Sequence, residues 1–188
     1  QEIYSIDECF VDLSGFSADQ ALVEAFKIRQ RLRQCLGLRV SVGLGASKTQ
    51  AKLASEIAKQ RGTTGVCDLS GRLSDERTAE MAAQPASQVW GIGRRTAVNL
   101  ESDGVCTVGD LLAKPDSWIR KRYSITLLRT INELKGQPCL DFQVEAVPRQ
   151  QVIASRSFCQ PVYDHADLVE AISTFVSRAA ERLRADRS

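Results

Sequence analysis

The chain has 188 residues, of which 43% are hydrophobic and 26% charged, with a formal net charge of +2. This length predicts one large or two to three small domains, and the composition is ordinary for a globular protein. No apolar run is long enough to span a membrane, and we expect no signal peptide. The six scattered cysteines include no CxxC pair, which argues against a zinc site and a disulfide framework and suits a reducing cytosol.

Near the start of the chain, two adjacent carboxylates, Asp7 and Glu8, interrupt an apolar, β-prone run. Neighbouring side chains of a regular strand point to opposite faces, so these two share one ion only if the chain reverses there. We expect residues 3–6 and 9–13 to pair as a hairpin with both carboxylates at its tip. Such a tip binds a hard cation such as Mg²⁺ through oxygen. The alternative is a solvated turn, because acidic residues are common in turns.

A helix is predicted over residues 17–36, where Ser17 and Gln20 form a capping box and Gly37 is placed as the C-terminal stop. Its apolar positions recur at a spacing of three to four: Leu22, Ala25, Phe26, Leu32 and Leu36. Residues 38–45 then alternate as a half-buried strand. The small residues on the second face of this strand allow close approach of another backbone or of a ligand.

A second helix is predicted from Ser47 to about residue 60, with a short return strand over residues 65–69. Together these elements predict an α+β sheet with helices packed on it. Lys48 and Lys52 lie one turn apart near the start of the helix. A strand, a turn and a helix start with lysines form a reasonable anion site, although no complete phosphate-binding loop is present.

Residues 74–136 lack alternation and predict several short helices. Within them, an apolar-Gly-apolar-Gly turn is the signature of a helix-hairpin-helix. Its glycines let a backbone approach closely and leave N–H groups free for a DNA phosphate, independent of base sequence. The residues expected to contact DNA are Gly91, Ile92, Gly93, Arg94 and Arg95. The alternative is a plain glycine turn between core helices. Trp90 and Trp118 are predicted to be core anchors.

After a helix predicted over residues 125–135, residues 141–151 are predicted to be a linker. Residues 151–158 then predict a new strand, and Asp164 or His165 begins an amphipathic helix. The apolar positions expected to face a core are Leu168, Ile172, Phe175, Ala179 and Leu183. No other strands complete this last unit, so we expect the chain to be truncated at its C-terminus.

Several segments, in order along the whole chain, resemble motifs of the Y-family translesion DNA polymerases. Residues 5–13 resemble the SIDE motif of that family, and residues 43–54 its second palm motif, with the same spacing to a lysine. Residues 89–95 resemble the hairpin of the thumb. This run, with residues 133–140 and 155–158, resembles most closely the bacterial UmuC group, the catalytic subunits of DNA polymerase V.

The resemblance implies an α+β fold of three parts: a palm-like sheet with packed helices, an all-α helix-hairpin-helix thumb, and the start of an α+β little-finger domain. The expected ranges are 1–68 for the palm, 69–140 for the thumb, 141–151 for the linker and 152–188 for the little finger. In that family, the carboxylates matching Asp7 and Glu8 are catalytic and bind two Mg²⁺ ions. The lysine matching Lys52 contacts the incoming triphosphate, with Lys48 as a second such contact.

The resemblance also implies an error-prone translesion polymerase of SOS damage tolerance, in the bacterial cytoplasm at the nucleoid. Its substrates would be primer-template DNA and deoxynucleoside triphosphates. Its partners would be a UmuD-like accessory dimer, a recombinase filament and the sliding clamp.

Some features depart from the family pattern. The family's first metal-binding aspartate precedes the SIDE motif, so we expect the isolated chain to be inactive. Gln50 stands where a larger apolar residue is usual. Two alternatives stay open: a relative that clamps DNA without chemistry, and a nucleotide cyclase, against which the thumb hairpin and the linker count.

Overall fold

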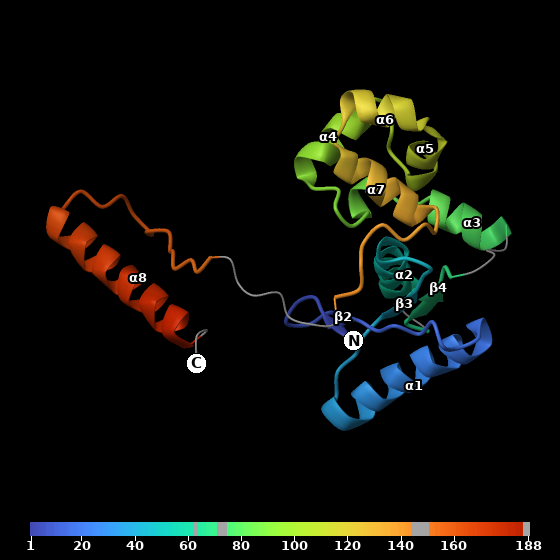
Figure 1. The fold of residues 1–188 in the computed structure, drawn as a ribbon, viewed down its shortest axis with the longest axis horizontal. Coiled ribbons are helices and arrows are strands. Elements are labelled where there is room, and N and C mark those ends of the chain that lie inside the picture. The colour runs from blue at the N-terminus through green and yellow to red at the C-terminus, as the bar shows by residue number, and fades with distance from the viewer. Residues whose placement is uncertain (62–63, 71–74, 144–150, 186–188) are drawn as a thin grey trace. The chain divides into compact units, whose positions relative to one another are not determined.

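A computed structural model describes residues 1–61, 64–70, 75–143 and 151–185, which fall into two compact units, residues 1–144 and 145–188. The elements of the first unit, in chain order, are β1 (Glu2–Ile3), β2 (Cys9–Phe10), α1 (Ala18–Leu36), β3 (Val42–Leu44), α2 (Lys48–Arg61), β4 (Val66–Asp68), α3 (Asp75–Ala82), the 3-10 helix η1 (Ala86–Gln88), α4 (Arg94–Ser102), α5 (Val108–Ala113), α6 (Asp116–Arg122) and α7 (Ile125–Leu134) (Figure 1).

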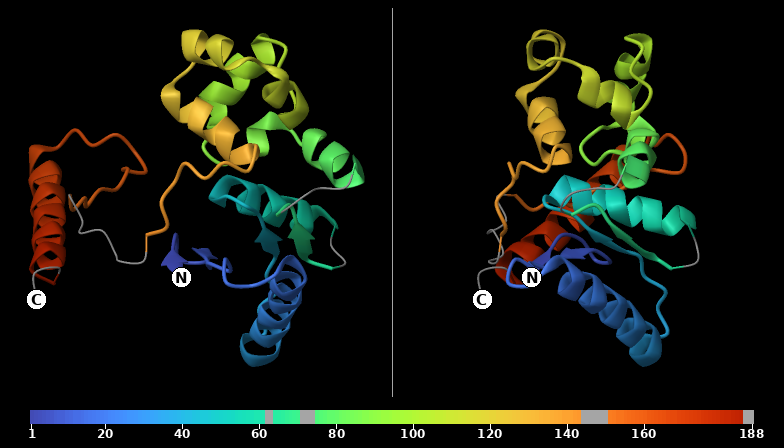
Figure 2. Two further views of the ribbon diagram at one scale, coloured as in Figure 1. Left: turned by 45° about the vertical axis from the view of Figure 1, so that its right-hand side comes forward. Right: turned by 90° about the vertical axis from the view of Figure 1, so that its right-hand side faces the viewer.

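The centre of the α/β part is a parallel pair of strands, β3 and β4, joined by α2. Helices α1 and α2 cover opposite faces of this pair, as Figure 2 shows. The alternation of side chains along the strands produces the two faces. Leu44 and Val66 pack with Ala25 of α1, whereas Cys67 joins the core formed with Leu53 of α2.

Close approach of α2 to β3 depends on two glycines, as the small face of this strand predicts. A Cβ atom at Gly43 would lie against backbone atoms of Ala51 and Ser55, and one at Gly45 against the backbone nitrogen of Ala51. Side chains at these positions would therefore push α2 away from the sheet. This spacing matters for function because α2 carries both candidate lysines.

The first helix is capped as predicted. The Ser17 hydroxyl accepts from the Gln20 N–H, the Gln20 side chain accepts from the Ser17 N–H, and Gly37 ends the helix with φ 70°. The strand after it is shorter than predicted. Only residues 42–44 pair with β4, and Leu38 is 55% exposed, because the part of the strand before residue 42 has no partner in this ladder.

The all-α part runs from α3 to α7, which confirms the prediction of several short helices over residues 74–136. Its core is continuous with that of α2. The fully buried side chains of this shared core include Leu53, Ile57, Leu100, Leu111, Ile119, Ile131 and Leu134. The two parts of the first unit therefore pack as one body.

The second unit consists of an extended segment followed by α8 (His165–Ala185). The strand predicted over residues 151–158 is wrong: residues 151–158 have no strand pairing, because the described part of the unit supplies no neighbouring strand to hydrogen-bond with. The Arg182 guanidinium donates instead to the Ile153 carbonyl at 3.0 Å. No residue of α8 is buried, and the apolar side predicted to face a core stays largely exposed, as at Ile172, which is 59% exposed.

Within the described ranges, no helix has both the length and the apolar character that crossing a membrane requires.

Candidate active site and nucleic-acid interface

Asp7 and Glu8 lie where the chain reverses, as predicted. β1 and β2 pair antiparallel, with Glu2 opposite Phe10 and Ile3 opposite Cys9. The N–H groups of Tyr4 and Ser5 both donate to the Glu8 carbonyl at 3.0 Å, and these bonds close the turn. The strands are shorter than the predicted ranges 3–6 and 9–13, so the carboxylates lie in an open turn instead of a long ribbon.

Lys52 of α2 reaches the turn and contacts Glu8. The Lys52 Nζ lies 2.7 Å from both carboxylate oxygens of Glu8, and the two side chains are 20% and 36% exposed. The same ammonium lies 5.3 Å from the centre of the Tyr4 ring. Asp7 accepts a 2.7 Å hydrogen bond from the Ser5 hydroxyl. The structure therefore brings two of the predicted site residues together, Glu8 and Lys52, while the Asp7 side chain bonds to Ser5 within the same turn.

Lys48 occupies a different environment. Its Nζ pairs with Glu2 at 2.6 Å and donates to the Asp141 carbonyl at 2.5 Å. It also lies near the ring centres of Phe10, at 5.5 Å, and Phe142, at 5.6 Å. Burial raises the pKa of Glu2, but hydrogen bonds from Lys48 and from a backbone N–H outweigh it, so the net shift of this pKa is downward. Lys48 thus ties the hairpin to the segment that follows α7.

The donor set of the turn suits Mg²⁺. This ion prefers oxygen ligands, and nucleotide enzymes hold it through one or two carboxylates together with substrate phosphates. Asp7 and Glu8 supply such carboxylates, and Glu8 already binds one cation, the Lys52 ammonium. Within the described residues, no group of three or more His, Cys, Asp or Glu side chains could hold a metal ion. The two carboxylates of the turn fit the kind of site in which substrate completes the coordination.

The predicted helix-hairpin-helix turn lies between η1 and α4. Gly91 has φ 90°, a conformation that L residues with side chains rarely adopt, and Gly93 is the N-cap of α4 without a side chain to cap it. The first-turn N–H groups of α4 are therefore left uncapped by this residue. Ile92 differs from its neighbours: its side chain is 7% exposed and belongs to the core, and its N–H donates to the Val89 carbonyl. Its side chain anchors the turn.

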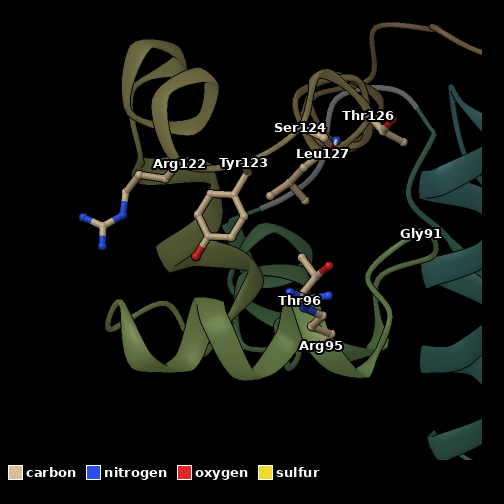
Figure 3. A pocket seen from close by; sticks show the side chains of 8 residues that line it. All are labelled: Gly91, Arg95, Thr96, Arg122, Tyr123, Ser124, Thr126 and Leu127. Atoms are coloured by element: carbon tan, nitrogen blue, oxygen red, sulfur yellow. Dashed lines mark hydrogen bonds between the residues drawn. The ribbon is translucent and has the colours of Figure 1, made fainter.

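A cavity of about 510 Å³ adjoins this turn. Its lining comes from two segments, the start of α4 and the junction between α6 and α7, as Figure 3 shows. The lining residues are Gly91, Arg95, Thr96, Arg122, Tyr123, Ser124, Thr126 and Leu127. Two arginines thus lie beside the starts of two helices, where backbone N–H groups favour anions.

The second wall of this cavity, at the junction between α6 and α7, was not predicted from the sequence. The sequence has a basic cluster over residues 120–122, but nothing local indicates that Arg122 lines the same cavity as Gly91. Its guanidinium contacts Asp103 at 2.6 Å, and the Tyr123 hydroxyl donates to the same carboxylate at 2.7 Å. Burial, with this hydrogen bond, raises the pKa of Tyr123 to about 12. Asp103 therefore fixes the orientation of this wall.

A buried carboxylate joins the α/β part to the all-α part. Glu133, near the end of α7, is 0% exposed and accepts three backbone hydrogen bonds. They come from the N–H of Thr49, at 2.9 Å, and from those of Cys139, at 2.6 Å, and Leu140, at 3.1 Å. The Ser47 hydroxyl donates to the Glu133 carbonyl at 2.7 Å. Glu133 therefore holds the first turn of α2, the helix that carries both lysines.

Gln50 strengthens the same junction. Its side-chain oxygen accepts from the Ala46 N–H at 3.0 Å, and its side-chain nitrogen donates to the Leu134 carbonyl at 2.9 Å. A larger apolar side chain would make neither bond, so the polar residue at this position has a structural role here.

Comparison with a solved structure defines the class of fold. The crystal structure of DinB from Sulfolobus solfataricus matches with a TM-score of 0.57 and 21% sequence identity, over 72% of this chain and 39% of DinB. At this identity the likeness concerns the fold alone. The protein therefore has a DinB-like fold, and the α+β class predicted from the sequence is confirmed.

Sequence comparison establishes the family. A model described as the impB/mucB/samB family matches residues 1–56, and one described as the C-terminal domain of the same family matches residues 149–188. Protein UmuC of Salmonella typhimurium is 40% identical over an alignment that covers 98% of this chain and 44% of UmuC. DNA polymerase IV of Brucella melitensis biotype 1 is 29% identical over 98% of this chain and 40% of that protein.

The chain belongs to the impB/mucB/samB family. The resemblance to the Y family, and within it to the UmuC group, is confirmed. The chain spans less than half the length of these two curated relatives, 44% of UmuC and 40% of the polymerase.

Proposed function

We propose that the full-length protein is an error-prone DNA polymerase that copies damaged templates during SOS damage tolerance. The observation that carries this proposal is the contact of Lys52 with both carboxylate oxygens of Glu8 at the tip of the β1–β2 hairpin. This contact places the carboxylate proposed to bind metal beside the ammonium proposed to bind phosphate. Family membership and relatives named UmuC and DNA polymerase IV support the same reading.

In this proposal, Asp7 and Glu8 hold the metal, and Lys52 exchanges Glu8 for the triphosphate of the incoming nucleotide. Two bound Mg²⁺ ions would supply charge neutralisation and activation of the primer hydroxyl. The Lys52 ammonium stabilises the negative charge that develops on the departing pyrophosphate. Lys48 is the second triphosphate contact in this proposal, and it must exchange Glu2 for the phosphate, as Lys52 exchanges Glu8.

The thumb turn grips the DNA backbone in this proposal. The uncapped N–H groups at the start of α4 and the charges of Arg94 and Arg95 suit phosphate oxygens. The cavity between this helix start and Arg122 has room for a phosphate and its sugar. Because these contacts address the backbone, binding should be independent of sequence and weaken with salt.

The experiment is an Asp7→Ala substitution in the full-length protein, assayed by primer extension and by DNA binding. We expect extension to fall by about 100-fold or more, because metal-bound charge stabilisation is lost, with DNA affinity unchanged within about twofold. The matched control is Glu24→Gln, which alters a half-exposed carboxylate on α1 that pairs with its neighbour Lys27. Unchanged extension by the Asp7 variant would refute the metal-binding role.

The second candidate is a relative that clamps DNA without chemistry. The thumb turn and its cavity favour it, because they need no metal. Gly93→Val separates binding from chemistry: a Cβ at Gly93 meets nothing within 4 Å, so the added side chain blocks only the approach to the turn. Affinity should fall on DNA of any sequence. If the wild-type protein binds DNA but extends no primer, the clamp is the correct function.

Partners and place of action follow from the family proposal. We propose that the protein acts at the bacterial nucleoid with a UmuD-like dimer, a recombinase filament and the sliding clamp. Extension past a lesion should rise when these three are added to the full-length protein. Extension that is equally fast without them would remove the partner proposal and leave the polymerase proposal intact.

A further inference from the structure

The indole of Trp90 joins the thumb turn to the carboxylate hairpin. Trp90 directly precedes Gly91, and its Nε1–H donates to the Tyr4 hydroxyl at 3.0 Å. The Tyr4 and Trp90 rings meet edge to face, with centres 5.3 Å apart and planes at 88°. Phe10 of β2 completes the cluster, with ring centres 5.7 Å from Trp90 and 5.9 Å from Tyr4. Trp90 is thus bound to the hairpin, instead of serving the thumb core as an anchor.

From Tyr4 the contacts continue to the candidate catalytic groups. The face of its ring lies against the Lys52 ammonium, and its backbone N–H donates to the Glu8 carbonyl. Lys52 in turn binds the Glu8 carboxylate. Each step is a direct contact, so one residue, Tyr4, links Trp90 to both Lys52, through its ring, and Glu8, through its backbone N–H.

The hairpin depends on such outside support. Its strands have two residues each, and isolated two-stranded hairpins are marginal in water. Within the described residues the hairpin buries little: Ile3 of β1 is 80% exposed and Ile6 of the turn is fully exposed. Catalysis requires carboxylates to be held in place to about 1 Å. A hairpin this short does not hold them so well unless a neighbouring residue fixes it. Trp90, through its contacts with Tyr4 and Phe10, supplies this support together with the Lys48–Glu2 and Lys52–Glu8 ion pairs.

We propose that Trp90 is a positioning residue: through Tyr4 it holds the carboxylate turn and the Lys52 ammonium in register with the DNA-gripping turn to which it belongs. The kinetic part of this inference rests on the polymerase function proposed above. Trp90 itself touches neither metal nor nucleotide in this account. Its role is to keep the primer held by the thumb aligned with the groups that act on the nucleotide.

The first test is hydrogen exchange in the full-length protein, which needs no catalysis. Tyr4→Phe removes one hydroxyl and keeps the ring on Lys52, and Trp90→Phe removes the N–H donor. In each variant, exchange of the Tyr4 and Ser5 amides should become roughly three- to tenfold faster, the range expected for one hydrogen bond. Unchanged protection in both variants would overturn the inference.

The second test is single-turnover extension with varied nucleotide concentration. Both variants should raise the apparent nucleotide Kd roughly three- to tenfold, with DNA affinity unchanged within about twofold. The double variant should change it by clearly less than the product of the single changes, because both remove the same bond. The matched control is Trp118→Phe, which alters the other tryptophan, in contact with Tyr123 and not with the hairpin.

The outcomes separate the two proposals. Multiplicative effects of Tyr4→Phe and Trp90→Phe, or an equal effect of Trp118→Phe, would overturn the positioning role. Wild-type protein that extends no primer would overturn the polymerase function alone, and the exchange experiment would still decide whether Trp90 holds the turn.

Discussion

Glu133→Ala is expected to lower the free energy of unfolding more than any other single substitution at the junction of α2 and α7. The side chain is 0% exposed, and its two oxygens accept three backbone N–H groups, from Thr49, Cys139 and Leu140. Alanine leaves these buried donors without an acceptor, and each such donor costs about 1–3 kcal/mol. Partial entry of water offsets some of this. The expected loss is about 3–5 kcal/mol, the range for removing one side of a buried charged contact.

Glu133→Gln sharpens the prediction. Glutamine keeps the size and one oxygen, but its NH₂ group must face a donor in place of the second oxygen. If the oxygen keeps Cys139 and Leu140, the Thr49 N–H at the start of α2 is left unpaired. The expected loss is about 1–3 kcal/mol, smaller than that for alanine.

The assay is urea unfolding followed by tryptophan fluorescence. Both tryptophans of the chain, Trp90 and Trp118, lie in the unit that contains Glu133, so the signal reports on that unit. The exposed Glu101→Ala serves as the control and should change stability by less than about 0.5 kcal/mol. A loss below about 1 kcal/mol for Glu133→Ala would refute the idea that this carboxylate joins the two parts, as would equal losses for the alanine and glutamine variants.

Three further predictions concern other parts of the same unit. Gly43→Ala should destabilise the protein by about 1–3 kcal/mol, because the methyl group would meet the Ala51 backbone, whereas Gly15→Ala, with nothing within 4 Å, should be near neutral in the same urea assay. Glu2 has a lowered pKa, so its contribution to stability is present above its unfolded value of 4.5 and is lost as pH falls through the folded value. In acid titrations of stability, Glu2→Gln should therefore fall less steeply than wild type below about pH 4.5; parallel curves would contradict this. Tyr123 has its pKa raised from 10.0 to about 12, so its contribution is present below pH 10.0 and is lost as pH rises toward 12. Tyr123→Phe should lack that alkaline loss, and a wild-type-like decline above pH 10.0 in this variant would show that another group causes it.

The candidate site was predictable wherever its signal is local. Three of these signals are local: the acidic pair in a β-prone run, the lysines one turn apart, and the pair Gly91 and Gly93. Each is recognisable from a few neighbouring residues. Lys52 was singled out in this way, and the structure does bring it to Glu8. The same pattern predicted Lys48 to be part of an anion site, and the resemblance implied a triphosphate contact, but its place between Glu2 and the Asp141 carbonyl depends on residues far away in the sequence.

Long-range partners explain what sequence reasoning missed. Nothing near Glu133 in the sequence indicates that its carboxylate is buried, because its partner Thr49 is 84 positions away. Trp90 was predicted to be a core anchor. Its contact with Tyr4 was not predicted, because Tyr4 is 86 positions away in the sequence. The strand predicted over residues 151–158 failed for the same reason, since a β-prone segment becomes a strand only when another strand supplies the hydrogen bonds.

The sequence by itself determined the class of fold, the family and, to within about one residue, the helices predicted over residues 17–36, 47–60 and 125–135. Helices form from contacts three and four residues apart, and caps such as Ser17 with Gln20 complete them locally, so periodicity and capping suffice. Only the tertiary structure decided which groups meet: the Lys52–Glu8 contact, the cavity walled by Arg122, and the tie from Trp90 to Tyr4. These contacts join residues far apart in the sequence, and their formation depends on how the elements of the unit pack against each other. No local pattern of residues encodes that packing.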